Sequence, residues 1–253
     1  MPELTHWLLY AGGLAVLVTA GVLILRSQRV GLGALPWLAV LRAAVQLSIV
    51  ALLLRGVLAW WWALAAFLAL MFVTAGLTGA RRASALPRGR AAALLGIGAG
   101  AVVSVGSIMG LGLVERSSQE LVAIAGILIG NAMTASTLSL RHLTSLLRDR
   151  RGEVEAWLAL GAAPVQSTAE LRREAIREAL IPNLDQTKST GLVTLPGAFV
   201  GALFGGASPI EAAAFQLVVL VGIFLGQSVT ASLATWWASG SPVLPAPDDA
   251  AVA

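Results

Sequence analysis

The chain of 253 residues contains no cysteine, only two histidines and few charged residues, which make up 12% of it. Without cysteine there can be no disulfide framework, no thiolate nucleophile and no zinc–cysteine site. His6 and His142 are too few to build a histidine-rich metal centre. Charge is also too scarce to cover the surface of a water-soluble globule of 26.0 kDa.

Apolar residues, by contrast, are abundant: they make up 57% of the chain, and its mean hydropathy is +0.83. Soluble domains have roughly half apolar and a quarter charged residues, so this composition indicates a polytopic membrane protein with little soluble mass. The net charge of +4 does not indicate a nucleic-acid partner. The basic residues lie between apolar runs, where they set membrane topology.

Seven apolar segments are candidates for membrane spans, each of which needs about 20 mostly apolar residues. Their expected ranges are 6–25, 35–54, 56–80, 96–114, 121–140, 189–206 and 211–237. We therefore expect an all-α bundle of about seven transmembrane helices that forms one domain, residues 1–240. A helical hairpin at 141–188 is inserted in this domain, and a disordered tail, 241–253, follows it.

The basic residues predict the orientation of these spans. When the segments alternate, 14 of the 17 basic residues fall on one side, leaving Arg55 and Arg116 on the other and Arg42 within a span. The positive-inside rule places the basic side in the cytoplasm. We expect a multi-pass protein of the cell (inner or plasma) membrane, with its N-terminus outside and its C-terminus in the cytoplasm.

The segment 141–188 holds eight of the 17 basic and seven of the 13 acidic residues. Its pattern predicts two cytoplasmic helices, 145–161, which ends at Gly161, and 165–180, which is bounded by Pro182. Ser167 is expected to cap the second helix, with Glu170 completing a capping box. A solvated connection or a helix on the membrane surface would show this pattern. A docking element for a soluble partner would show it too, and the shortness of most other loops favours docking.

One motif in this segment favours docking further. The residues Glu155-Ala156-x-x-x-x-Gly161 are similar to the first half of the EAA-type loop of ABC-transporter permeases, which seats in a groove of the ATPase subunit. The second half of that pattern is met only loosely, by Leu180-Ile181-Pro182.

Further short motifs follow one another through residues 40–220. They are Leu41-Arg42-Ala43-x-x-Gln46-Leu47, Gly126-x-x-x-Gly130-Asn131-Ala132-Met133, Arg173-Glu174-Ala175, Ala179-Leu180-Ile181-Pro182, Gly191-Leu192-Val193-x-Leu195-Pro196-Gly197, Gly205-Gly206-Ala207-x-Pro209, Ala212 and Gln216. In this order they resemble the FetB-type (YbbM-type) ABC permease family, whose members are described as iron exporters and whose plant relatives are linked to aluminium tolerance.

The resemblance implies a permease homodimer that exports a metal ion such as iron and is bound to two copies of a separate ATPase, which would hold ATP and Mg²⁺. The sequence itself contains no G-x-x-x-x-G-K-[ST] loop. The chain is therefore expected to be no enzyme and to bind no cofactor. The residues expected to couple it to the ATPase are Glu155, Ala156, Gly161, Arg172, Arg173 and Glu174.

Polar residues inside the spans are costly unless they have a partner or face a wet cavity. Arg42 either reaches the cytoplasmic headgroups or, together with Gln46, faces the bundle and binds Asn131 or a backbone carbonyl. The resemblance favours the second interpretation. The candidates for the translocation path are Arg42, Gln46, Asn131, Met133, Thr134 and Gln216. Hydrogen bonding between helices is the plainer alternative for the residues at mid-span.

The sixth span contains Leu195-Pro196-Gly197, which predicts a break or kink. A break would provide a hinge and free carbonyl groups, whereas a kink would be satisfied by neighbouring helices. Gly197, Gly201 and Gly205 repeat at a spacing of four and are predicted to lie at a helix–helix or subunit contact. The pairs Gly96/Gly100, Gly106/Gly110, Gly126/Gly130 and Gly222/Gly226 have the same spacing.

No metal ligands can be assigned from the sequence. Where the family pattern has methionine, this chain has Ile127, Ala198 and Phe199, so the thioether sulfur that suits soft metal ions is missing there.

Two other functions remain open. One is an ATP-independent secondary carrier, which would lack an adjoining ATPase gene. The other is a mechanotransmitting or scaffolding membrane subunit, which usually carries a sizeable outer domain, and the outer loops here are short.

Overall fold

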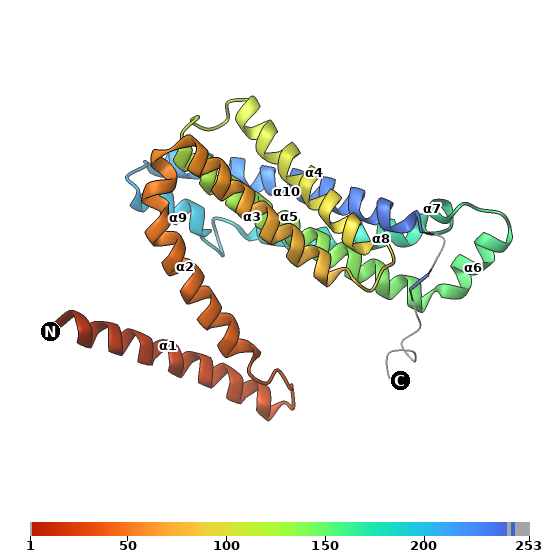
Figure 1. The fold of residues 1–253 in the computed structure, drawn as a ribbon, viewed down its shortest axis with the longest axis horizontal. Helices are drawn as coiled ribbons and strands as arrows, with labels where there is room; N and C mark the ends of the chain where they lie inside the picture. The colour runs from red at the N-terminus through yellow and green to blue at the C-terminus, as the bar shows by residue number, and fades with distance from the viewer. Residues whose placement is uncertain (1, 242–243, 246–253) are drawn as a thin grey trace. The chain divides into compact units, whose positions relative to one another are not determined.

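The computed structural model describes residues 2–241 and 244–245, and the side chains of 6–54, 56–241 and 244–245. These residues form helices joined by short connections (Figure 1), and the predicted all-α fold class is confirmed. The helices are α1 (Pro2–Ser27), α2 (Leu35–Ala59), α3 (Trp61–Arg82), α4 (Gly89–Gly110), α5 (Ser118–Asp149), α6 (Arg151–Ala159), α7 (Pro164–Ser167), α8 (Ala169–Ser189), α9 (Gly197–Phe204) and α10 (Pro209–Ser239).

The chain divides into two compact units, Met1–Trp60 and Trp61–Ala253. In the first unit, α1 and α2 are two long apolar helices joined by a tight turn, in which Arg29 and Gly33 have positive φ angles of 58° and 55°. In the second unit, α4, α5 and α10 pack against one another, and α3 packs against α4 and α5. Side chains from all three of these helices, such as Ile97 of α4, Leu128 of α5 and Ala231 of α10, are fully or almost fully buried there.

A seam of small residues joins α4 to α10. A Cβ atom added to Gly100 would lie 1.9 Å from Thr230 Oγ1 and 2.5 Å from the Gly226 carbonyl oxygen. A Cβ atom on Gly96 would lie 2.9 Å from the Ala234 Cβ. Helix packing, which a glycine spacing of four favours, is thus confirmed for Gly96, Gly100 and Gly226, because only glycine lets the two backbones approach this closely. At Gly106 and Gly110 an added Cβ would meet no atom within 4 Å, so the spacing alone did not identify the seam.

Six of the described helices are long and apolar enough to cross a membrane: α1, α2, α3, α4, α5 and α10. The expected count of seven is not confirmed. Within the expected sixth span, 189–206, the only helix beyond the last residue of α8 is α9, which has eight residues. The residues before it, 190–196, form an irregular loop around Gly191, whose φ is +93°. Eight helical residues rise only about 12 Å, which is too short to cross a bilayer.

The helix expected to stop before Pro182 continues to Ser189, so that predicted boundary is wrong. Proline inside a helix costs about 3 kcal/mol, but α8 packs along both α5 and α10. Leu171, Ala175 and Ala179 are buried on this packed face. Tertiary packing over 21 residues outweighs the loss of one backbone hydrogen bond.

The predicted cap at Ser167 is also wrong. Ser167 ends the one-turn helix α7, and its Oγ donates to the Pro164 carbonyl oxygen at 2.9 Å. Thr168 separates α7 from α8 and donates to the same carbonyl oxygen, also at 2.9 Å. The extra turn begun by Pro164 therefore takes the hydroxyl group of Ser167, which was expected to cap the second helix.

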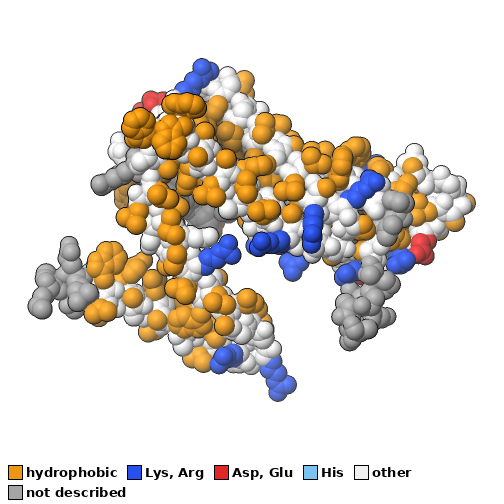
Figure 2. Space-filling model, in the orientation of Figure 1, with side chains coloured by type: hydrophobic (Ala, Val, Ile, Leu, Met, Phe, Trp, Pro, Cys, Tyr) orange, Lys and Arg blue, Asp and Glu red, His pale blue; other side chains and the backbone are white. Residues whose placement is uncertain are grey.

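Hydrophobic side chains are spread widely over the face seen in Figure 2, and acidic side chains are few there. Many of the exposed residues are large, including Leu52 at 82% and Val102 at 72% exposure. Such an extensive apolar surface fits hydrocarbon rather than water. Basic residues at the end of α3, before the start of α4 and on the last third of α5 mark one end of the bundle, which also carries α6 and α7. We call it the hairpin end, and its marker residues are Arg81, Arg82, Arg88 and Arg141.

Candidate functional site

The hairpin end extends into two short helices beyond the bundle (Figure 1). α5 runs on from the bundle to Asp149, α6 follows after Arg150, and α7 leads back into α8. Val154 of α6 and Leu171 of α8 are buried in one cluster with Leu143 and Leu147 of α5. These contacts attach the hairpin to the bundle, so that α5, α6 and α8 meet in a packed corner.

The turn after α6 depends on Gly161, as the sequence predicted. Its φ of +91° lies in the left-handed region. The Ala162 N–H donates to the Trp157 carbonyl oxygen at 3.0 Å, and the Gly161 N–H donates to the Leu158 carbonyl oxygen at 2.9 Å. This pair of bonds is the Schellman arrangement that ends helices at a glycine. It turns the chain sharply and leaves residues 157–163, which we call the tip, at the far end of the hairpin.

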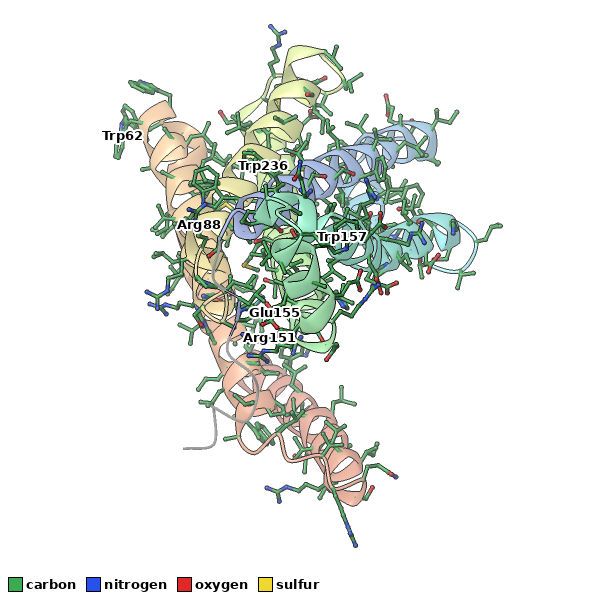
Figure 3. The ribbon with its side chains drawn as sticks, turned by 90° about the vertical axis from the view of Figure 1, so that its right-hand side faces the viewer. Trp62, Arg88, Arg151, Glu155, Trp157 and Trp236 are labelled. Carbon is green, nitrogen blue, oxygen red and sulfur yellow. The ribbon has the colours of Figure 1, made fainter. Side chains whose placement is uncertain are left out.

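Ion pairs connect the elements of the corner. Arg150 binds both Glu153 of α6, at 2.9 Å, and Glu174 of α8, at 3.1 Å. Arg151 binds Glu155 at 2.7 Å, and Figure 3 shows these two side chains together on α6. Each pair is about half exposed and contributes little by itself, about 0–1 kcal/mol. Their placement matters more, because Arg150 bridges the end of α5 to α8.

Of the six predicted coupling residues, Arg172 is the one in a sheltered position. Its Nη2 donates to the Val165 carbonyl oxygen at 3.2 Å, which joins α7 to α8. Partial burial, and then the neighbouring charge of Arg173, lower the pKa of Arg172 below the usual arginine value. Arg173 is exposed and pairs with Glu170. Glu155, Ala156 and Gly161 are exposed at or beside the tip.

Two exposed apolar side chains on α6 and the tip were not singled out by the sequence analysis. Leu160 is 81% exposed and Trp157 is 52% exposed, and Figure 3 shows Trp157 on α6. An exposed leucine and tryptophan among charged neighbours are typical of a surface that another protein covers. The signal in the sequence was a pair of large apolar residues at the end of a short helix whose first half carries Arg151, Glu153 and Glu155.

Inside the bundle, the predicted path residue Asn131 is joined to Gln227. Gln227 Nε2 donates to Asn131 Oδ1 at 3.3 Å, and Asn131 Nδ2 donates to the Ile127 carbonyl oxygen at 2.9 Å. Gln216 is buried elsewhere on α10, where its Oε1 accepts from the Phe199 N–H of α9 at 3.1 Å. Gln216 and Gln227 are about 16 Å apart along α10, so they belong to two separate polar contacts.

Met133 and Thr134, which were also predicted to line the path, take no part in these two polar contacts. Met133 packs in a cluster with side chains of α3, and Thr134 is exposed, with its hydroxyl donating to the Gly130 carbonyl oxygen at 3.1 Å. Arg42 and Gln46 are exposed on α2, in the first unit. The path assignment of these residues stays a prediction.

The predicted helix break lies between α8 and α9, where α9 begins directly after Pro196. A Cβ atom added to Gly197 or Gly201 would meet no atom within 4 Å, and at Gly205 it would meet only atoms of α9 itself. Within the described part of the chain these glycines therefore do not pack another helix closely. Their predicted role at a subunit contact stays a prediction.

The Asn131–Gln227 pair yields a test of the helix–helix interpretation. Replacing Asn131 or Gln227 with leucine should lower the melting temperature in detergent by a few degrees, because each change leaves the other amide without its partner. In the double variant, the two effects should fall short of additivity by about 0.6 kcal/mol. Thr134→Val serves as the control, since Thr134 bonds only within its own helix in the structure. Strict additivity would show that the pair contributes nothing.

Among the described residues there is no group of three or more histidine, cysteine, aspartate or glutamate side chains that could hold a metal ion. The structure thus assigns no resident metal centre to the described residues.

Comparison with known proteins agrees with this architecture. Residues 8–241 match the model of an uncharacterised protein family, UPF0014. The rice UPF0014 membrane protein STAR2 is 36% identical over 213 residues, which cover 83% of this chain and 74% of that protein. Protein ALUMINUM SENSITIVE 3 of Arabidopsis thaliana is 34% identical over 227 residues, covering 87% and 83%.

A bacterial relative has a name that states an activity. The protein described as "Probable iron export permease protein FetB" of Escherichia coli K12 is 31% identical over 222 residues, which cover 87% of this chain and 84% of that protein. No solved structure matches the chain. Since the family match includes all the helices from α2 to α10 and most of α1, this chain is a multi-pass membrane protein of the UPF0014 family, the FetB-type permease family that its motifs resemble.

Proposed function

We propose that this chain is the permease subunit of an ATP-binding-cassette transporter that exports a metal ion such as iron. A separate ATPase subunit would bind ATP and Mg²⁺ and would dock on the hairpin. Two copies of the permease and two copies of the ATPase would form the working transporter. The hairpin end would face the cytoplasm, with the N-terminus outside and the C-terminus inside.

The observation that carries this proposal is the tip of the hairpin. It projects beyond the bundle and exposes Trp157 and Leu160 beside the EAA-like residues Glu155 and Gly161. An apolar anchor with a charged rim suits a groove on a soluble partner. The relative named as an iron export permease supports both the transport function and the choice of iron as the first ion to test.

Movement of the tip would be transmitted to the bundle through α5 and α8. α5 is a helix of 32 residues that reaches from the far end of the bundle to the hairpin, and α8 leads back along it. Arg150 ties this corner to α8 through Glu174. ATP binding would close the ATPase dimer, displace the tip and tilt α5 and α8 together. Transport requires that ATP favours one of the two conformations.

Reconstitution tests the function directly. The chain and its cognate ATPase are placed together in liposomes, and ATP hydrolysis and ion movement are measured over a panel of divalent metals. We expect ATP-dependent movement of Fe²⁺ and faster hydrolysis in its presence. An ATPase variant without the phosphate-binding lysine is the control and should give neither signal.

Two results would contradict the proposal. Ion movement by the chain alone, without the ATPase and ATP, would indicate a secondary carrier. The second result is an ATPase that binds the chain and hydrolyses ATP without moving any of the metals. It would exclude metal export, and the transporter would then have a different substrate.

A further inference from the structure

The end of α8 is far more hydrophilic than the helices around it. Residues 183–189 read Asn-Leu-Asp-Gln-Thr-Lys-Ser, so six of seven are polar. Asp185 and Lys188 form an ion pair at 3.1 Å, and their side chains are 62% and 77% exposed. On the packed side of the helix, Asn183 Oδ1 is buried without a hydrogen-bond partner among the described residues.

This segment lies at bilayer depth. α8 begins at the hairpin end, where Leu171 shares a buried cluster with Ala238 of α10. Its last turn leads to Thr190, which lines a cavity of about 330 Å³ together with Gln216 and Leu220. From Leu171 to Ser189 the rise along α8 is about 27 Å, and from Ala238 to Leu220 the rise along α10 is also about 27 Å.

Both helices therefore place the Asp185–Lys188 pair more than about 20 Å from the level of Leu171 and Ala238 at the hairpin end. A hydrocarbon core is about 30 Å thick. At the other end, Leu220 is about 14 Å from Glu211, where α10 begins. The segment 183–189 thus lies between the two surfaces of the membrane, although residues 183–188 were expected to belong to the cytoplasmic hairpin.

Lipid cannot be the neighbour of this segment. Placing aspartate or lysine at the bilayer centre costs about 2.5–3.5 kcal/mol or more for each. The chain then continues into the irregular loop 190–196, in which Leu192 and Val193 are 98% and 81% exposed. Non-helical backbone at this depth is tolerated only where protein buries it or where it lines a water-filled cavity. A helix–helix contact in the membrane favours small residues and hydrogen-bonding amide or hydroxyl groups, and it does not account for a largely exposed aspartate–lysine pair.

We propose that the last two turns of α8, residues 183–189, and the loop 190–196 form the wall of a water-filled path through the membrane. This inference rests on the proposed permease function and locates its translocation path. The polar groups that this wall offers are carboxylate, amide and hydroxyl oxygens and one ammonium group, beside the exposed apolar side chains of Leu192 and Val193. It contains no thiol, thioether or imidazole. Such a wall suits a hydrophilic ion that crosses with part of its water shell.

The absence of cysteine from the natural sequence makes the test direct. Lys188→Cys and Gln186→Cys are made singly, and the second variant keeps the Asp185–Lys188 pair intact. Membrane vesicles of both orientations, containing the chain with or without its ATPase, are treated with a membrane-impermeant methanethiosulfonate cation. We expect both cysteines to react at least tenfold faster than the control, Val102→Cys. Val102 is 72% exposed on α4 at mid-span.

Labelling after denaturation in detergent confirms that every variant carries a free thiol. If both α8 cysteines react as slowly as Val102→Cys in every vesicle preparation, the proposal is overturned. Rapid oxidative cross-linking of two chains at Lys188→Cys, with no reaction with the cation, would also overturn it and would indicate a contact between copies. The test needs no transport activity, so labelled cysteines in a chain that does not work with an ATPase would refute the proposed function and leave the path standing.

Discussion

Replacing Gly100 with alanine should lower the melting temperature of the purified protein by about 2–12 °C. The new Cβ atom would lie 1.9 Å from Thr230 Oγ1 and 2.5 Å from the Gly226 carbonyl oxygen. The threonine side chain can rotate, but the carbonyl belongs to the backbone of α10, so the two helices must separate. Overpacking of this kind costs about 1–3 kcal/mol, and each kcal/mol shifts the melting temperature of a protein of this size by about 2–4 °C.

The same helix supplies the matched control. At Gly106 an added Cβ would meet no atom within 4 Å, and alanine is a better helix former than glycine by about 0.5–1 kcal/mol. Gly106→Ala should therefore leave the melting temperature unchanged or raise it slightly. Fluorescence-detected size-exclusion chromatography after heating measures both variants. Equal melting temperatures for the two would show that the seam between α4 and α10 is looser than described.

Replacing Leu160 with aspartate should weaken the association of the ATPase by about 10- to 100-fold. If the ATPase covers this side chain, docking removes an almost fully exposed leucine from water. Burying a leucine side chain contributes about 1.5–3 kcal/mol, which corresponds to this range of dissociation constants. Trp157→Ala should have an effect of similar size. Co-purification from membranes and titration of the ATPase against the chain in detergent measure the change.

Leu32→Asp is the control for charge and hydrophobicity. Leu32 lies in the turn between α1 and α2 and is 41% exposed, and the predicted orientation places this turn on the same side of the membrane. We expect its variant to bind the ATPase as the natural chain does. A Leu160→Asp chain that retains full binding would remove the tip from the docking site, and a loss of binding in both variants would indicate a general effect of added charge.

Much of the fold could be predicted because long apolar runs have few alternatives in a membrane. Only helices satisfy every backbone group within a single segment, so the six long helices follow from their composition. The break before Gly197 could be anticipated for a similar reason, since Pro196 has no N–H and resists helix continuation. The glycine pairs were less informative, because a spacing of four is present whether or not a second helix is near.

The hairpin was predictable in outline but not in detail. Gly161 ends α6 as expected, because its φ is positive. Local patterns misplaced the end of α8, since Pro182 is a stop signal only until packing against α5 and α10 is taken into account. Trp157 and Leu160 are significant because of their exposure, and exposure depends on where the rest of the chain lies.

The scarcity of charge thus determined the class of protein, six of the seven expected spans and the approximate position of the hairpin, because these depend on local chemistry and on the cost of polar groups in lipid. Tertiary structure decided which glycines touch and how far α8 reaches. Their polar composition alone predicts that residues 183–189 lie in water at the membrane surface. The packing of α8 on its neighbours carries the same residues into the thickness of the bilayer, because depth is a property of contacts between helices and not of any single segment.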